Sequence, residues 1–140
     1  MPAPLLGQLS GATDGVRLSI HVLAATIWVG GQFTVAGLLP TVRKLGAEAP
    51  KQIANAFSRL MWPAYAVLLI TGVWNVAATN KGQPTSWQVV LGVKVGVVVV
   101  SGLAAWLHAR SKSRRGLAVW GALTGLSAAA ALVLGVFLAG

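Results

Sequence analysis

Two ionisable side chains lie inside long apolar stretches of this sequence, and these residues are the best placed to do chemistry. His21 falls near the start of one apolar stretch, and Lys94 falls within another. Ionisable groups inside a membrane span are costly and mark functional sites by default. At 1.5 Å per residue, His21 lies roughly 6 Å and Lys94 roughly 10 Å below the same surface. We therefore expect both side chains at one level, where they could ligate a metal.

Other polar side chains follow His21 along its predicted helix. His21, Ala25, Trp28 and Gln32 are separated by steps of four, three and four residues. These steps place them on one helical stripe, which should face the interior of the protein because it holds polar groups. Trp28 and Gln32 are therefore candidate pocket residues.

A second stripe contains Lys94. Lys94, Ser101 and His108 repeat every seven residues, and Asn75 lies near the same outer level on another helix. His108 lies about 20 Å deeper than Lys94 at the helical rise, so one cofactor could not bind both histidines of one chain. Ser101 and Asn75 join the candidate pocket, whereas His108 is expected to be an interfacial residue of the basic cluster.

The charge of Lys94 limits what the pocket can bind. A membrane ammonium needs an anion or must lose its proton, and the only acids in the sequence are Asp14 and Glu48. Lys94 is therefore neutral, extended to the interface, paired with Asp14, or paired with a bound ligand. An anionic cofactor with a metal centre, such as haem b, would satisfy both Lys94 and His21. In a simpler alternative, His21 only bonds a neighbouring carbonyl and Lys94 only reaches the interface.

The composition defines the elements that must position these residues. Hydrophobic residues make up 56% of the 140 residues and charged residues 9%, against about 25% charged in soluble domains. Spanning a bilayer takes about 20 residues. The sequence predicts an all-α, integral membrane four-helix bundle that forms a single domain, 1–140, with spans at about 16–39, 59–78, 87–109 and 116–139. Pro40 is expected to end the first span.

The distribution of charge predicts the orientation. Eight Lys and Arg residues fall on one side of the predicted spans and only Arg17 and Lys81 on the other. Because basic loops stay in the cytoplasm, this bias predicts a multi-pass protein of the cell membrane with both termini outside. Residues 1–13 lack the basic start of a signal peptide, so the first span should act as its own targeting signal. A net charge of +9 does not indicate nucleic-acid binding here, because most of it lies in loops between apolar spans.

The remaining residue types bear on copper. Copper(I) sites favour Cys and Met ligands, but the chain has no Cys, and its only methionines are Met1 and Met61. A copper(II) site could use His21, although a single imidazole is a poor site. Copper binding therefore ranks below haem binding.

Three segments also resemble a known family. Residues 18–40 (LSIHVLAATIWVGGQFTVAGLLP), 57–75 (FSRLMWPAYAVLLITGVWN) and 91–108 (LGVKVGVVVVSGLAAWLH) resemble the first three helices of the copper-resistance D superfamily. The related four-helix, haem-associated protoporphyrinogen oxidase family has a first-helix histidine and a third-helix lysine that match His21 and Lys94. This resemblance implies haem b bound at those two residues.

Together these patterns predict a small membrane haem protein for electron transfer or haem-dependent redox chemistry at the outer face. A protoporphyrinogen oxidase-like enzyme and a copper transport or resistance protein are the alternatives. The expected partners are the lipid bilayer, haem, and a redox partner or a second copy of the chain. The expected metal ligands are His21 and Lys94, in a pocket lined by Trp28, Gln32, Asn75 and Ser101.

Overall fold

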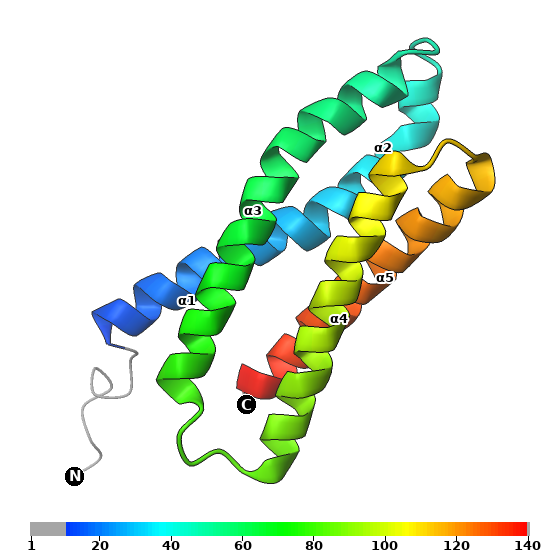
Figure 1. Ribbon diagram of the computed structural model, residues 1–140. Helices are drawn as coiled ribbons and strands as arrows, with labels where there is room; N and C mark the ends of the chain where they lie inside the picture. The colour runs from blue at the N-terminus through cyan, green and yellow to red at the C-terminus, as the bar shows by residue number, and fades with distance from the viewer. Residues whose placement is uncertain (1–10, 140) are drawn as a thin grey trace.

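The computed structural model describes residues 11–139, and these residues form helices joined by short connections (Figure 1). The first long helix consists of α1 (Ala12–Ala25), the π-helical turn η2 (Thr26–Gly30) and α2 (Gly31–Arg43); it is followed by α3 (Ala49–Thr79), α4 (Thr85–Arg110) and α5 (Arg114–Ala139). All four long helices are apolar and long enough to cross a membrane. The predicted all-α class and the four spans are confirmed. The prediction that residues 1–13 lack the start of a signal peptide falls mainly on residues 1–10, outside the described part.

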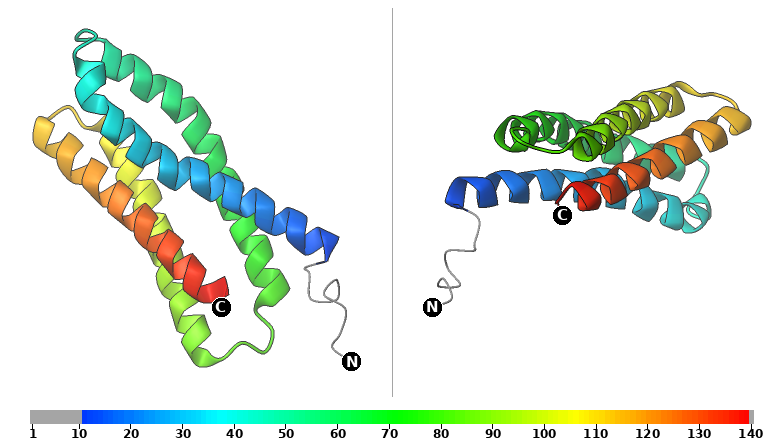
Figure 2. Two further views of the ribbon diagram at one scale, coloured as in Figure 1. Left: turned by 180° about the vertical axis from the view of Figure 1, so that it is seen from behind. Right: turned by 90° about the horizontal axis from the view of Figure 1, so that it is seen from below.

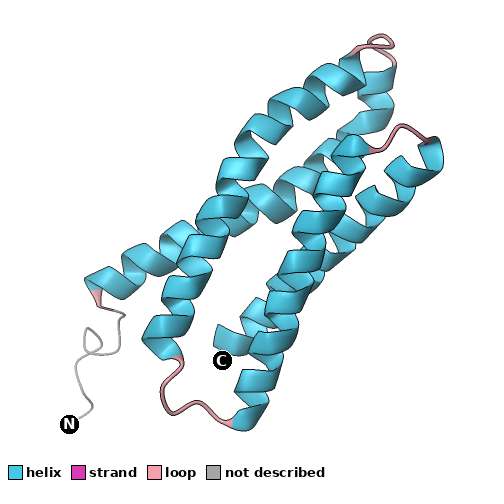
Figure 3. Cartoon of the chain, in the orientation of Figure 1, coloured by secondary structure: helices cyan, strands magenta, loops and turns pink. Residues whose placement is uncertain are grey.

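The helices are arranged as two hairpins in two layers. The first long helix contacts α3, and α5 contacts both α4 and η2. Seen from below, α1, α2 and α5 lie in one layer and α3 and α4 in the other (Figure 2). The α2–α3 and α4–α5 connections lie at one end, whereas the α3–α4 connection lies at the other end, where α1 begins and α5 ends (Figure 3). Both basic connections therefore share one end of the bundle, which we call the basic end; the opposite end is called the α1-start end.

Two helices extend further than the sequence predicted. Pro40 lies inside α2, which continues to Arg43, so the expectation that Pro40 ends the span is wrong. α3 begins at Ala49, well before the predicted span at 59–78, so Pro63 lies well inside it. Membrane helices tolerate internal proline because neighbouring groups satisfy the freed backbone carbonyl.

The packed core lies near mid-bundle around one tryptophan. Trp28 is 2% exposed and forms a cluster with three small or flexible buried residues and several partly buried aromatic side chains. Its ring centroid lies 4.3 Å from that of Tyr65 and 5.8 Å from that of Trp62. A Cβ atom at Gly102 would overlap the Tyr65 ring, so glycine is required at this approach of α3 to α4. Burial of these aromatic rings is the main packing contribution to the fold.

Tryptophans outside the core occupy mixed positions. Trp106 is exposed and stacks under the Arg110 guanidinium at 4.1 Å, as expected of a residue at a membrane interface. The indole of Trp87 donates to the Leu138 carbonyl at 3.3 Å and so joins the start of α4 to the end of α5. Trp62 instead packs against the core.

Candidate functional site

The π-helical turn changes the direction of the predicted first-helix stripe. Residues 26–30 form η2, and Trp28 lies at its centre. A π turn inserts an extra residue into the helical repeat, so side chains before and after it no longer follow one α-helical stripe. His21, before the turn, bonds α3, whereas Gln32, after it, lines a groove of about 360 Å³ with α5. Nothing in the sequence pattern signalled this turn.

Trp28 and Ser101 come together in a closed network at mid-bundle. The Trp28 indole donates to the Ser101 hydroxyl at 3.0 Å, and this hydroxyl lies 3.2 Å from the Thr124 carbonyl, to which it donates. The Thr124 hydroxyl donates in turn to the Ser101 carbonyl at 2.9 Å. Ser101 is 1% exposed. These three residues, which we call the mid-bundle network, satisfy one another and tie η2, α4 and α5 together.

His21 is held by a hydrogen bond across the α1–α3 interface. Its Nδ1 lies 2.7 Å from the Thr71 hydroxyl oxygen. When that hydroxyl donates its single proton to the Val67 carbonyl, 2.7 Å away, it accepts from an Nδ1–H of His21. In the neutral imidazole, Nε2 then carries the lone pair. This is the arrangement by which proteins orient a metal-binding histidine through its second nitrogen.

Lys94 lies at a similar level on the other hairpin. The Tyr65 hydroxyl donates to the Val98 carbonyl at 2.9 Å, which fixes the register of α3 against α4. Counting outward from that bond at 1.5 Å per residue puts Thr71 about 9 Å and Lys94 about 6 Å toward the α1-start end. The two residues thus come from different hairpins but occupy neighbouring levels.

The Lys94 ammonium packs against a glycine of α5. A Cβ atom at Gly135 would lie 2.9 Å from Lys94 Nζ, so the lysine end occupies the space that the missing side chain leaves. Within the described part of the chain, the only ion pair joins Arg17 to Asp14, so Lys94 is not paired with Asp14. Of the four alternatives for Lys94, the pairing with Asp14 is therefore not the one found among these residues.

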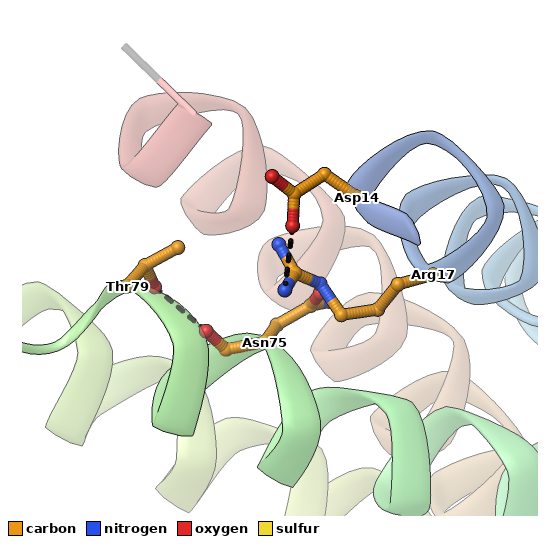
Figure 4. A network of polar contacts seen from close by, with 4 residues as sticks. All are labelled: Asp14, Arg17, Asn75 and Thr79. Carbon is orange, nitrogen blue, oxygen red and sulfur yellow. Dashed lines mark hydrogen bonds and ion pairs between the residues drawn. The ribbon is translucent and has the colours of Figure 1, made fainter. Parts of the chain in front are cut away.

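One turn beyond His21, the structure adds Arg17 to the site. The sequence pattern had indicated only that this residue is a charge on one side of the spans. Arg17 is 4% exposed, and its Nη1 pairs with Asp14 Oδ1 at 3.0 Å (Figure 4). Its Nε has no partner among the described residues, and neither does the buried Oδ1 of Asn75. The spacing of four residues between Arg17 and His21 was the available signal, because it places both on one helix face.

We call these residues the outer polar cluster, because they lie toward the α1-start end of the bundle: Arg17, His21, Thr71, Asn75 and Lys94. Two of the predicted pocket residues, Trp28 and Ser101, lie in the mid-bundle network instead. Gln32 lies further toward the basic end, and both polar atoms of its amide are buried without a partner among the described residues. His108 donates from Nδ1 to the Leu117 carbonyl at 2.9 Å, near the basic α4–α5 connection.

The donor set of the outer polar cluster fits haem better than a bare metal ion. No group of three or more His, Cys, Asp or Glu side chains comes together in residues 11–139. The cluster instead offers one oriented imidazole, one amine and one guanidinium. Haem takes one or two axial ligands on its iron and carries two propionates, so an imidazole, an amine and a guanidinium are types of group that could hold it. His21 and Lys94 would hold the iron or its propionates.

Comparison with known proteins adds no family assignment. The chain matches no family model, no curated protein and no solved structure. The fold and the site therefore define a class, a four-helix membrane protein with a cationic polar cluster at one end of the bundle.

Proposed function

We propose that the chain is a haem b-binding membrane protein for electron transfer or haem-dependent redox chemistry. The observation that carries this proposal is the His21–Thr71 hydrogen bond at 2.7 Å, which leaves the imidazole Nε2 as a preformed ligand atom. We further propose that the protein lies in the cell membrane with its basic connections in the cytoplasm, because basic loops are retained there. The outer polar cluster then lies near the external surface.

When bound, haem would supply a one-electron redox centre. The chain's own residues would set the properties of that centre. Thr71 keeps the His21 ring in one orientation and one tautomer. Lys94 serves either as the second axial ligand, as a neutral amine, or as a cation for a propionate.

Absorption spectra of the purified protein, oxidised and reduced, test the proposal. Protein from haem-supplemented cells is expected to show a Soret band that His21→Ala removes. The matched control is Ser19→Ala, because Ser19 lies two residues before His21 and is exposed. This variant should keep the band. A folded protein without a Soret band would overturn the proposal.

Lys94→Met separates the two roles of the lysine. If Lys94 ligates the iron, the variant should keep haem but change from a low-spin to a high-spin spectrum or take up a methionine-ligated one. If Lys94 only pairs with a propionate, the spectrum should stay unchanged while the affinity falls.

The same preparations discriminate the alternatives. Complementation of a strain that lacks its own protoporphyrinogen oxidase, lost in His21→Ala, would indicate the enzyme. Copper-dependent growth that persists in haem-free cells would indicate transport, and would count against the haem proposal.

A further inference from the structure

The buried guanidinium of Arg17 is only partly satisfied. Its Nη1 pairs with Asp14 at 3.0 Å, but the Asp14 side chain is 53% exposed, so this acid is at the edge of the site. Arg17 Nε is buried and has no hydrogen-bond partner among residues 11–139. An unpaired donor of a charged group is costly when buried, and more so in a membrane. The guanidinium therefore has unused capacity for an anion.

Arg17 lies opposite Asn75 on the antiparallel helix α3. The His21–Thr71 hydrogen bond fixes the register of α1 against α3, and Arg17 and Asn75 are each four residues further toward the α1-start end. Figure 4 shows the Asn75 side chain extending toward the guanidinium, while the Asn75 carbonyl accepts from Thr79 at 2.7 Å. The buried Asn75 Oδ1 also lacks a partner in the described part of the chain. Two buried polar atoms that have no partner among the described residues thus lie at the same level of α1 and α3.

The chemistry of the guanidinium selects the ligand group. Arginine presents its N–H donors as a planar fork, and this fork binds a carboxylate through two parallel hydrogen bonds. Asp14 occupies one Nη1 position only, so a second carboxylate would bind through the free Nε–H and would compete with Asp14 for the single positive charge of the guanidinium. Arg17 is also one helical turn, roughly 6 Å, outward of His21 on the same face of α1.

We propose that Arg17 binds a carboxylate of the ligand held by His21, namely a haem propionate, in competition with Asp14. This inference rests on the proposed haem function. It gives a cation other than Lys94 to the propionates and leaves Lys94 available to the iron. In the alternative, Arg17 only joins the outer ends of α1 and α3.

Haem and its dimethyl ester distinguish these roles, because the ester has the same ring and iron but no carboxylates. The experiment titrates the detergent-solubilised, haem-free full chain with each compound and follows the Soret band. Wild-type protein is expected to bind haem about tenfold or more tightly than the ester, since one charge-assisted hydrogen bond supplies that difference. Arg17→Gln should bind haem about tenfold more weakly and the ester with unchanged affinity.

Two further substitutions should change the affinity for haem in opposite directions. Asp14→Asn removes the competing carboxylate, so haem affinity should rise a few fold. Asn75→Asp places a carboxylate next to Arg17, so haem affinity should fall while the haem-free protein becomes more resistant to unfolding. Neither substitution should change the affinity for the ester.

The outcomes separate this inference from the haem proposal. Equal binding of haem and ester by wild type and by Arg17→Gln would overturn the role of Arg17 and leave the haem site standing. Binding of neither compound by folded wild-type protein would overturn both. If Arg17→Gln fails to fold, Asp14→Asn and Asn75→Asp still decide: unchanged haem affinity in both would contradict the competition.

Discussion

The polar side chains of the mid-bundle network are paired with one another, whereas those of the outer polar cluster are only partly paired. At mid-bundle, the indole of Trp28 and the hydroxyls of Ser101 and Thr124 bond one another. In the outer polar cluster, Arg17 Nε and Asn75 Oδ1 have no partner among the described residues. Closed networks fix a structure, whereas unsatisfied buried groups call for a functional explanation.

The two regions also differ in how tightly α4 is packed. The buried residues of α4 are Ser101, Gly102, Ala104 and Ala105, and none lies between Thr85 and Val100. Within α4, tight packing is therefore concentrated in the middle and toward the basic end. Stability should depend mainly on the mid-bundle region, and ligand affinity mainly on the outer polar cluster.

The largest effect on stability is expected for Trp28→Ala. Removing this ring leaves a cavity among Tyr65, Trp62 and Met61, and truncation of a buried aromatic costs about 3–5 kcal/mol. Unfolding in mixed detergent micelles, followed by circular dichroism, measures the loss. Trp74→Ala, at an exposed position, is the matched control and should lose much less; equal losses would refute the placement of the core.

Ser101→Ala should affect stability without affecting the ligand. It leaves the Trp28 indole N–H buried and unpaired, which costs about 1–3 kcal/mol. Haem affinity, measured by Soret titration, is expected to stay within a factor of two. A tenfold loss of affinity would show that the mid-bundle network belongs to the ligand site after all.

Thr71→Val, unlike Ser101→Ala, should lower the affinity for haem. The substitution removes the hydroxyl that accepts from His21 Nδ1, and loss of such a supporting bond typically lowers metal affinity 10–100-fold. Haem titration measures the effect. Thr79→Val removes a hydroxyl that bonds only the α3 backbone, so it is the control and should bind haem as wild type does.

The smallest effect is expected for Gly135→Ala. The new methyl group would displace the Lys94 ammonium by a few tenths of an ångström, because its position lies 2.9 Å from Nζ. We expect a change of about two- to threefold in haem affinity, or a small shift of the absorption maximum. Gly96→Ala, where nothing lies within 4 Å of the added atom, should change neither quantity. A shift of equal size in both variants would place Lys94 elsewhere.

The sequence predicted the helices well because hydropathy over 20-residue windows determines them directly. It also brought His21 and Lys94 to neighbouring levels, since helical rise converts residue number into depth. It missed the consequence of η2, because a π turn depends on local backbone bonding rather than on composition. Arg17 was missed as a site residue because its position near the start of the first span indicated only a charge that contributes to orientation.

Haem-dependent stabilisation of three proteins tests the division between the two regions most directly. At a haem concentration of 100 times Kd, wild type should gain about 2.7 kcal/mol of unfolding free energy. Ser101→Ala should start lower and gain the same amount, whereas His21→Ala should gain nothing. A full gain in His21→Ala, or its loss in Ser101→Ala, would contradict the assignment of ligand binding to the outer polar cluster.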